Sequence, residues 1–219
     1  GYFGIRIPEE YGGLGLGVFE YCLITEELAR GWMSVASIIA RAGSVMGVVG
    51  WPIEKRLELT KKAARGEYLV AVSLSEPDVG SDLAAVSCKA VLDGDEWVIT
   101  GNKYWCTFAD GADYLSVLCR VEPDDAHPYK GLRSFVIEKP RGELPEGCQG
   151  SPIPKIGYFG WKTWELAFDG CRIPKMNIQG GDTLTTLNTE SIFSPLARLE
   201  FRTKIIKEIP FIEGYVQST

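Results

Sequence analysis

The N-terminal part of the chain carries apolar residues at helical spacing. From Val18, apolar side chains recur every three or four positions with Glu and Arg between them, which predicts an amphipathic helix ending near Gly31. Residues 34–49 are rich in small apolar side chains and predict a buried helix. Residues 53–65 predict a charged helix with Gly66 as its C-cap. The stretch PEEYGGLGLG that precedes these helices has too many glycines and prolines for the interior of an element.

From residue 67 the pattern changes to short segments that are rich in β-branched and aromatic residues and separated by turn clusters. Such segments are typical of strands. Asp93-Gly94, within LDGDEW, predicts a tight hairpin turn. Six segments at this spacing predict an antiparallel barrel or sandwich. They are EYLVAVSLS, VSCKAVLD, EWVITGNKYWCT, DYLSVLCRV, LRSFVIEK and WELAFDGCRI.

We therefore predict an α+β chain in three parts. A partial N-terminal helical domain covers 1–66, a middle antiparallel β-barrel-like domain covers 67–177, and an irregular C-terminal tail covers 178–219. The tail is polar and weakly patterned, although PLARLEFRTKIIKEI fits one amphipathic helix before Pro210.

Composition narrows the classes of partner and site. The net charge of −6 and the pI near 5.0 argue against a nucleic-acid partner. The best candidate for a membrane span, residues 32–51, contains Arg41 and several small polar residues, so a buried helix fits it better. The single histidine, His127, lies in a polar loop pattern, and no metal site is predicted.

The six cysteines form no CxxC pair. Their scattered spacing predicts reduced thiols in a reducing compartment, with a secreted disulfide framework as the alternative. We expect a cytoplasmic location, or the mitochondrial matrix in a eukaryote.

The stretch SEPDVGSD, residues 75–82, follows an apolar strand pattern. Pro77 sets a turn, Gly80 lets the backbone approach a ligand closely, and Ser75 and Ser81 offer hydroxyls. Exposed N–H groups in such a turn can bind an anionic phosphate. The alternative is an ordinary loop whose Asp and Ser side chains bond their own backbone.

Two further stretches carry candidate chemistry. Trp105 and Thr107 lie two apart on a strand pattern, so their side chains share a face that could line a planar, hydrogen-bonding cofactor. The alternative is a half-buried Trp with Thr beside it. In KIGYFGWKTWELAFDGCRIP, Lys155 and Lys162 could face an anionic group, or they could be solvated lysines.

Taken in order, these stretches resemble the acyl-CoA dehydrogenase family. GYFGIRIPEEYGGLGLG resembles the family's N-terminal helical region, and SLSEPDVGSD resembles its LTEPGAGSD loop. DGDEWVITGNKYWCTFADGADYLSVLCRV resembles the hairpin that carries the family's Trp-Ile-Thr flavin contact. KIGYFGWKTWELAFDGCRIP resembles the end of its β domain. The resemblance runs from Gly1 to about Asn177.

The resemblance implies a set of site residues. Ser75 would bond the flavin edge, Gly80 and Ser81 would approach the FAD pyrophosphate, and Thr107 would lie at the reactive edge of the ring. Ser81 would also contact the acyl-CoA. Two departures are mild: Ser75 replaces the family's Thr and keeps a hydroxyl, and Cys106 replaces Ile. The residues expected against FAD are Val72, Leu74, Ser75, Gly80, Ser81, Trp105, Cys106 and Thr107.

The resemblance also implies an activity and partners. Family members carry out FAD-dependent α,β-dehydrogenation of an acyl-CoA thioester to the 2-enoyl-CoA, with a glutamate as general base, and pass electrons to an electron-transfer flavoprotein or a similar acceptor. They are expected to be homo-oligomers. No residue of this chain aligns with the base, which the family carries in a C-terminal helical domain.

We therefore expect the chain to be part of a longer enzyme and to have little or no dehydrogenase activity alone. Two alternatives stay open at this point. One is a non-catalytic fragment that retains part of a flavin site, and the other is an acyl-CoA oxidase-type flavoprotein.

Overall fold

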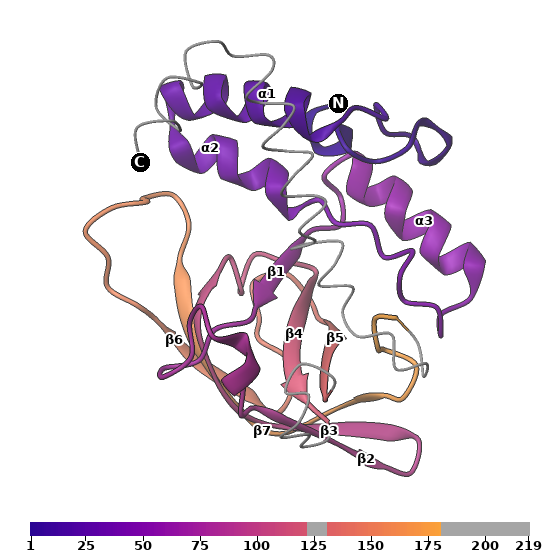
Figure 1. Ribbon diagram of the computed structural model, residues 1–219, viewed down its shortest axis with the longest axis vertical. Helices are drawn as coiled ribbons and strands as arrows, with labels where there is room; N and C mark the ends of the chain where they lie inside the picture. Colours follow the sequence, from indigo (N-terminus) through magenta and orange to yellow (C-terminus); the bar gives the residue numbers. More distant parts are fainter. Residues whose placement is uncertain (122–130, 181–219) are drawn as a thin grey trace, which may run out of the picture.

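The computed structural model describes residues 1–121 and 131–180. The α-helices lie at one end of the molecule and the strands lie at the other, with the first strand starting between them (Figure 1). This is the α+β arrangement that the sequence predicts. The predicted tail, apart from residues 178–180, lies outside the described residues, as does His127.

The helices confirm two of the three predicted. The α-helices are α1 (Val18–Gly31), α2 (Met33–Ile38) and α3 (Ile53–Ala64), and the short 3-10 helices are η1 (Tyr2–Gly4), η2 (Glu9–Tyr11), η3 (Ile39–Arg41) and η4 (Leu83–Ala85). Helix α1 has the predicted bounds, and the Glu20 carboxylate accepts a hydrogen bond from the Gly17 N–H at its start. After α3, Gly66 takes a left-handed φ of 78° and donates to Ala63 O, which confirms the predicted cap.

The predicted helix over 34–49 is wrong in length. Helix α2 ends at Ile38, and only one 3-10 turn follows before the chain continues in turns to Trp51. Val45, Val48 and Trp51 are nevertheless buried, together with Tyr114 of the sheet. The apolar composition therefore reflects burial, while the three glycines of GSVMGVVG disfavour helical backbone.

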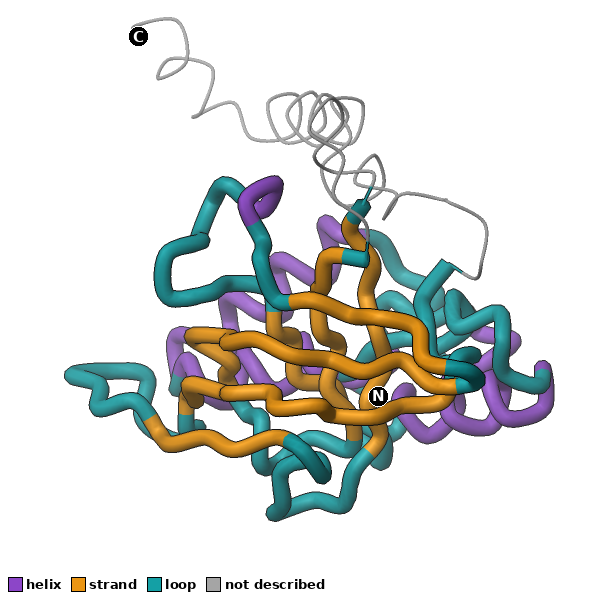
Figure 2. The backbone as a smooth tube through the Cα atoms, turned by 90° about the horizontal axis from the view of Figure 1, so that it is seen from below, coloured by secondary structure: helices purple, strands orange, loops and turns teal. Residues whose placement is uncertain are grey.

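Seven strands form one sheet that curls into a partial barrel (Figure 2). Its order is β1-β4-β2-β3-β7-β6. Strand β5 lies outside this order and also pairs with β4. The strands are β1 (Val70–Ser73), β2 (Lys89–Asp93), β3 (Glu96–Thr107), β4 (Tyr114–Arg120), β5 (Leu132–Glu138), β6 (Cys148–Pro152) and β7 (Thr163–Pro174).

The sheet departs from the prediction in two details. Strand β1 runs parallel to β4, and Lys89 of β2 pairs in parallel with Arg120 of β4, so the barrel is not wholly antiparallel. Strand β6 (CQGSP) was not predicted, because it has no β-branched or aromatic residue and four of its five residues are exposed. The hairpin between β2 and β3 turns at Gly94, whose φ of 65° confirms the predicted turn.

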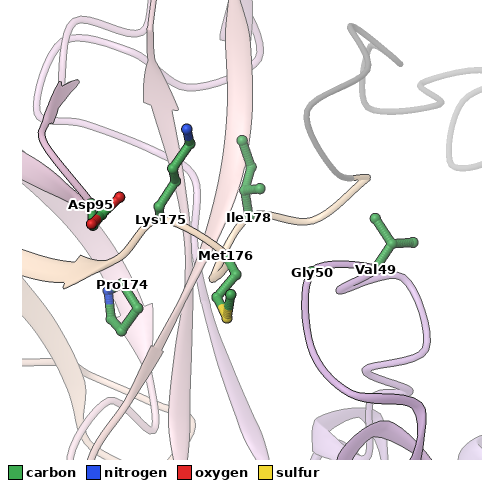
Figure 3. Close-up of a pocket in the computed structure, with 7 residues that line it drawn as sticks. All are labelled: Val49, Gly50, Asp95, Pro174, Lys175, Met176 and Ile178. Carbon is green, nitrogen blue, oxygen red and sulfur yellow. The ribbon is translucent and has the colours of Figure 1, made fainter.

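The helical part and the barrel meet at the segment that follows β7. The Trp51 indole donates to Asn177 Oδ1 at 2.7 Å, and the Asn177 amide donates to Val136 O. A cavity of about 420 Å³ opens beside this junction (Figure 3). It is lined by Val49, Gly50, Asp95, Pro174, Lys175, Met176 and Ile178.

Substitution of Gly101 in β3, with Gly94 in the preceding turn as a comparison, tests how tightly β3 packs against Cys88. At Gly101 (φ 141°) an added Cβ would lie 2.7 Å from the backbone Cα of Cys88, whereas at Gly94 it would meet nothing within 4 Å. We predict that Gly101→Ala lowers the free energy of unfolding by roughly 2–4 kcal/mol, from overpacking and backbone strain together. Gly94→Ala, which tests a left-handed φ alone, should cost about 1 kcal/mol. Urea titration measures both, and equal losses would contradict the packing of β3 on Cys88.

Candidate functional site

The loop SEPDVGSD, residues 75–82, is held to the barrel by a buried ion pair. Glu76 is 6% exposed, and Lys103 Nζ of β3 lies 2.9 Å from its Oε1. Both side chains are almost fully removed from water. Charged groups are buried in this way only when partners satisfy them, so this pair defines where the loop sits.

The remaining bonds to Glu76 come from the segment that enters β2. The Ser87 N–H and hydroxyl donate to Oε2 at 2.9 and 2.7 Å, and the Cys88 N–H donates to Oε1 at 2.9 Å. Burial alone would raise the pKa of Glu76, but the hydrogen bonds from Ser87, Cys88 and Lys103 outweigh it and hold the pKa below its ordinary value. Glu76 is therefore ionised at neutral pH.

The residues directly before Glu76 are fastened to β3 as well. Lys103 Nζ also donates to Leu74 O at 2.9 Å, and the Tyr104 N–H donates to Ser75 O at 2.8 Å. Leu74 and Ser75 consequently lie against the part of β3 that leads into Trp105.

Beyond Glu76 the loop turns back on itself and opens to solvent. Glu76 and Val79 exchange two backbone hydrogen bonds around Pro77-Asp78, and the Val79 side chain is buried. Gly80 and Ser81 are exposed, and an added Cβ at Gly80 would meet nothing within 4 Å. Within the part of the chain that the structure describes, their N–H groups make no hydrogen bond. Free N–H groups beside an unobstructed glycine can bind an anion.

Strand β3 is irregular where it passes the loop. Its pairing with β7 shifts between Lys103 and Cys106, and Trp105 adopts a left-handed φ of 64°. Phe108, directly after the strand, has a φ of 72°. Bulky residues rarely take this conformation, and backbone strain of this kind concentrates at functional sites. The bulge leaves the Trp105 indole 56% exposed.

Trp105 and Thr107 lie on the accessible side of β3, and Cys106 between them points into the core. The Thr107 hydroxyl lies 3.1 Å from the Thr163 hydroxyl of β7, which also accepts a bond from Lys155 Nζ. Burial raises the pKa of the Cys106 thiol to about 11, so this thiol stays neutral. Only the backbone of Cys106 can contribute to a ligand on the Trp105 side.

The two candidate lysines serve local structure. Lys155 Nζ donates to Tyr158 O and Trp161 O and orders the Tyr158–Trp161 loop. Lys162 Nζ lies 3.5 Å from the Asp110 carboxylate and is mostly exposed.

Two family models match the chain. The model for the acyl-CoA dehydrogenase N-terminal domain matches residues 1–72, and the model for the acyl-CoA dehydrogenase middle domain matches residues 71–171. The chain belongs to the acyl-CoA dehydrogenase family.

Individual members of the family agree. A (2S)-methylsuccinyl-CoA dehydrogenase of Cereibacter sphaeroides is 37% identical over 188 residues, which cover 83% of this chain and 34% of that protein. A mitochondrial isovaleryl-CoA dehydrogenase of Oryza sativa subsp. japonica is 36% identical over 181 residues, which cover 81% of this chain and 43% of that protein. The chain thus spans between a third and a half of the length of these relatives.

The fold agrees too. The structure of a glutaryl-coenzyme A dehydrogenase in complex with glutaryl-CoA matches with a TM-score of 0.70 and 32% identity, over 85% of this chain and 48% of that chain.

The structure therefore brings together two of the stretches that the family resemblance singles out. Leu74 and Ser75 adjoin β3 just before Trp105, and Val72 is 40% exposed on β1, the strand that leads into the loop. Their contact with FAD, like that of Gly80, Ser81, Cys106 and Thr107, stays a prediction.

Sequence reasoning missed Glu76 and Lys103 as the residues that position the loop. One signal was present, because Lys103 falls in phase with the buried Trp97 and Ile99 along β3. A lysine is almost never fully buried unless it is paired, so this position indicates a partner inside the barrel.

Other parts of the described chain offer no metal site and no membrane span. No group of three or more His, Cys, Asp or Glu side chains within residues 1–121 and 131–180 could hold a metal ion. No helix in those ranges is long and apolar enough to cross a bilayer.

The ion pair predicts a pH dependence. Because the pKa of Glu76 is lowered by folding, its contribution to stability is present above its ordinary value of 4.5 and is lost as the pH falls through the folded pKa. Glu76→Gln should therefore be less stable than the wild type at pH 7, and the gap should narrow below pH 4.5. Urea titrations across this range measure it.

Glu58→Gln is the matched control. Glu58 pairs with Lys62 on the exposed side of α3, and its pKa is also lowered by that partner. High salt should abolish the loss of stability in Glu58→Gln, because that ion pair is exposed, and should leave the loss in Glu76→Gln unchanged. A gap for Glu76→Gln that stays constant with pH would show that the carboxylate charge does not hold the loop.

Proposed function

We propose that this chain forms the N-terminal and middle parts of an FAD-dependent acyl-CoA dehydrogenase. Its substrate would be an acyl-CoA thioester and its product the 2-enoyl-CoA, with an electron-transfer flavoprotein or a similar carrier as acceptor. Family membership supports the reaction class, since the relatives it matches are named as dehydrogenases of acyl-CoA thioesters. We also propose that the complete protein is a homo-oligomer.

One observation carries the proposal. The loop SEPDVGSD is clamped to β3 directly before the Trp105 bulge, so an anion-binding turn and an exposed aromatic face stand on neighbouring backbone. FAD combines a pyrophosphate with a planar ring, which are the two kinds of group that these features accept.

The residues fit this cofactor in distinct ways. The free N–H groups at Gly80 and Ser81 suit pyrophosphate oxygens, and the missing Cβ at Gly80 leaves room for close approach. The exposed Trp105 indole suits one face of the ring, and the Thr107 hydroxyl suits its edge. We further assign to the Ser81 hydroxyl a contact with the acyl-CoA.

FAD, when bound, supplies a two-electron acceptor. The chain itself holds and orients: Ser75 and Thr107 offer hydroxyls, and Trp105 excludes water from one side of the ring. We assign no general base to the described residues, and we propose that this chain alone has little or no dehydrogenase activity.

Thr107 provides the test. The chain is incubated with FAD and desalted, and retained flavin absorbance is measured, with the Kd taken from quenching of flavin fluorescence. Loss of one hydrogen bond in Thr107→Ala should weaken FAD binding roughly five- to tenfold, whereas Thr107→Ser should bind as the wild type does.

Thr100→Ala is the control, because Thr100 is an exposed threonine on the same strand that precedes the shift between Lys103 and Cys106. An unchanged Kd for Thr107→Ala would remove Thr107 from the site. Absence of any retained flavin in the wild type would contradict a flavin site formed by this chain unaided.

A further inference from the structure

Two buried cysteines lie in contact beneath the loop. Cys88 Sγ and Cys119 Sγ are 3.8 Å apart, and both residues are 0% exposed. All six cysteines of the chain are free thiols, and Cys148 and Cys171 are buried in the same core. Among the described residues, Cys88 and Cys119 are the two thiols that lie within hydrogen-bond range of each other.

The backbone of this pair suits a disulfide. Lys89 pairs with Arg120 in a parallel register, and the Arg120 N–H donates to Cys88 O at 2.7 Å, so the two cysteines stand one residue before a paired position on adjacent strands. Neighbouring strands lie about 4.8 Å apart, within the range of about 4.4–6.8 Å between Cα atoms that a disulfide spans. A shift of the two sulfur atoms toward each other, by somewhat under 2 Å in all, would bring them to bonding distance.

Cys88 is joined directly to the clamp that holds the loop. Its N–H donates to the same Glu76 oxygen that Lys103 binds. On its other side, Cys88 packs on the Gly101 backbone so closely that an added Cβ there would lie 3.1 Å from the sulfur. Because Cys88 cannot move toward β3, a displacement of Cys88 strains its hydrogen bond to Glu76.

The environment makes the two thiols unequal. A hydrogen bond from the Cys119 thiol, and after it the nearby Lys103 ammonium, lower the pKa of Cys88, whereas burial raises the pKa of Cys119. Cys88 is thus the better nucleophile and Cys119 the partner that completes the reaction.

We propose that Cys88 and Cys119 form a redox-sensitive dithiol, which a hydroperoxide oxidises to a disulfide that loosens the SEPDVGSD loop. The Cys88 thiolate attacks the peroxide and becomes a sulfenic acid, and the peroxide is reduced to an alcohol or water. The Cys119 thiol then attacks the sulfenic sulfur, an S–S bond forms and water leaves. The peroxide takes up the two electrons that the thiols lose.

Loosening the loop would lower FAD affinity, a consequence that rests on the proposed function. FAD binding should in turn affect the oxidation of the two thiols. Both thiols are fully buried, so peroxide reaches them when the loop opens, and FAD that holds the loop closed should slow their oxidation.

The test begins with the wild-type chain and hydrogen peroxide. After quenching and denaturation, iodoacetamide labels the remaining thiols, and peptide mapping locates any cross-link. The expected result is a fall from six labelled cysteines to four, a peptide that links Cys88 to Cys119, and reversal by dithiothreitol. Six labelled cysteines, or a cross-link between Cys148 and Cys171 instead, would overturn the proposal.

Two variants and a second readout sharpen the result. Cys119→Ser should leave Cys88 as a sulfenic acid that dimedone traps, and Cys148→Ser should keep the cross-link. Amide exchange at Ser87 and Cys88, which both donate to Glu76, should accelerate severalfold on oxidation. A cross-link with unchanged exchange would overturn the effect on the loop. Faster amide exchange with unchanged FAD affinity would instead contradict the proposed role of the loop in flavin binding and leave the redox proposal standing.

Discussion

Burial of the Glu76 carboxylate with the Lys103 ammonium is the constraint on which the rest of the site depends. Neither charge can leave water alone, because an unpaired buried ion costs several kcal/mol. The pair therefore stays together, and its other bonds, to Leu74, Ser87 and Cys88, bring three chain segments to one point. A buried ion pair adds little net stability, but an arrangement that separates it leaves an uncompensated buried charge and is strongly disfavoured. Here the arrangement is a loop fastened at its base with its outer turn, at Gly80 and Ser81, left open.

The same pair shapes β3. Lys103 faces inward to reach Glu76, and the pairing with β7 shifts directly after it. The shift releases Trp105 into a left-handed conformation in which its indole faces solvent while Cys106 returns to the core. The open turn at Gly80 and Ser81 and the exposed Trp105, the two parts of the proposed flavin site, thus both adjoin one interaction, and the Cys88–Cys119 contact lies beside it. We therefore expect a change in the ion pair, the loop, the bulge or the thiol pair to alter the other three.

Local features could be predicted from the sequence, and long-range ones could not. Helix α1 was predicted correctly because its apolar period ends at a glycine, and the β2–β3 turn because Gly94 permits a positive φ. The segment before Trp51 looked helical because burial and helical periodicity resemble each other in short apolar runs. The Glu76–Lys103 pair joins residues 27 positions apart, so the phase of Lys103 along β3 indicates a buried lysine but not which residue is its partner. The order of family-like motifs indicated which stretches to expect in the proposed site, but not what holds them together.

A double-mutant cycle measures this interaction most directly. The free energies of unfolding of the wild type, Glu76→Gln, Lys103→Met and the double variant are determined by urea titration under one set of conditions. If the pair is the clamp, each single change leaves the other group buried without its partner, and the double variant should lose less than the sum of the two by at least about 1 kcal/mol. Additive losses, within about 0.5 kcal/mol, would show that Glu76 and Lys103 act independently and would contradict the account.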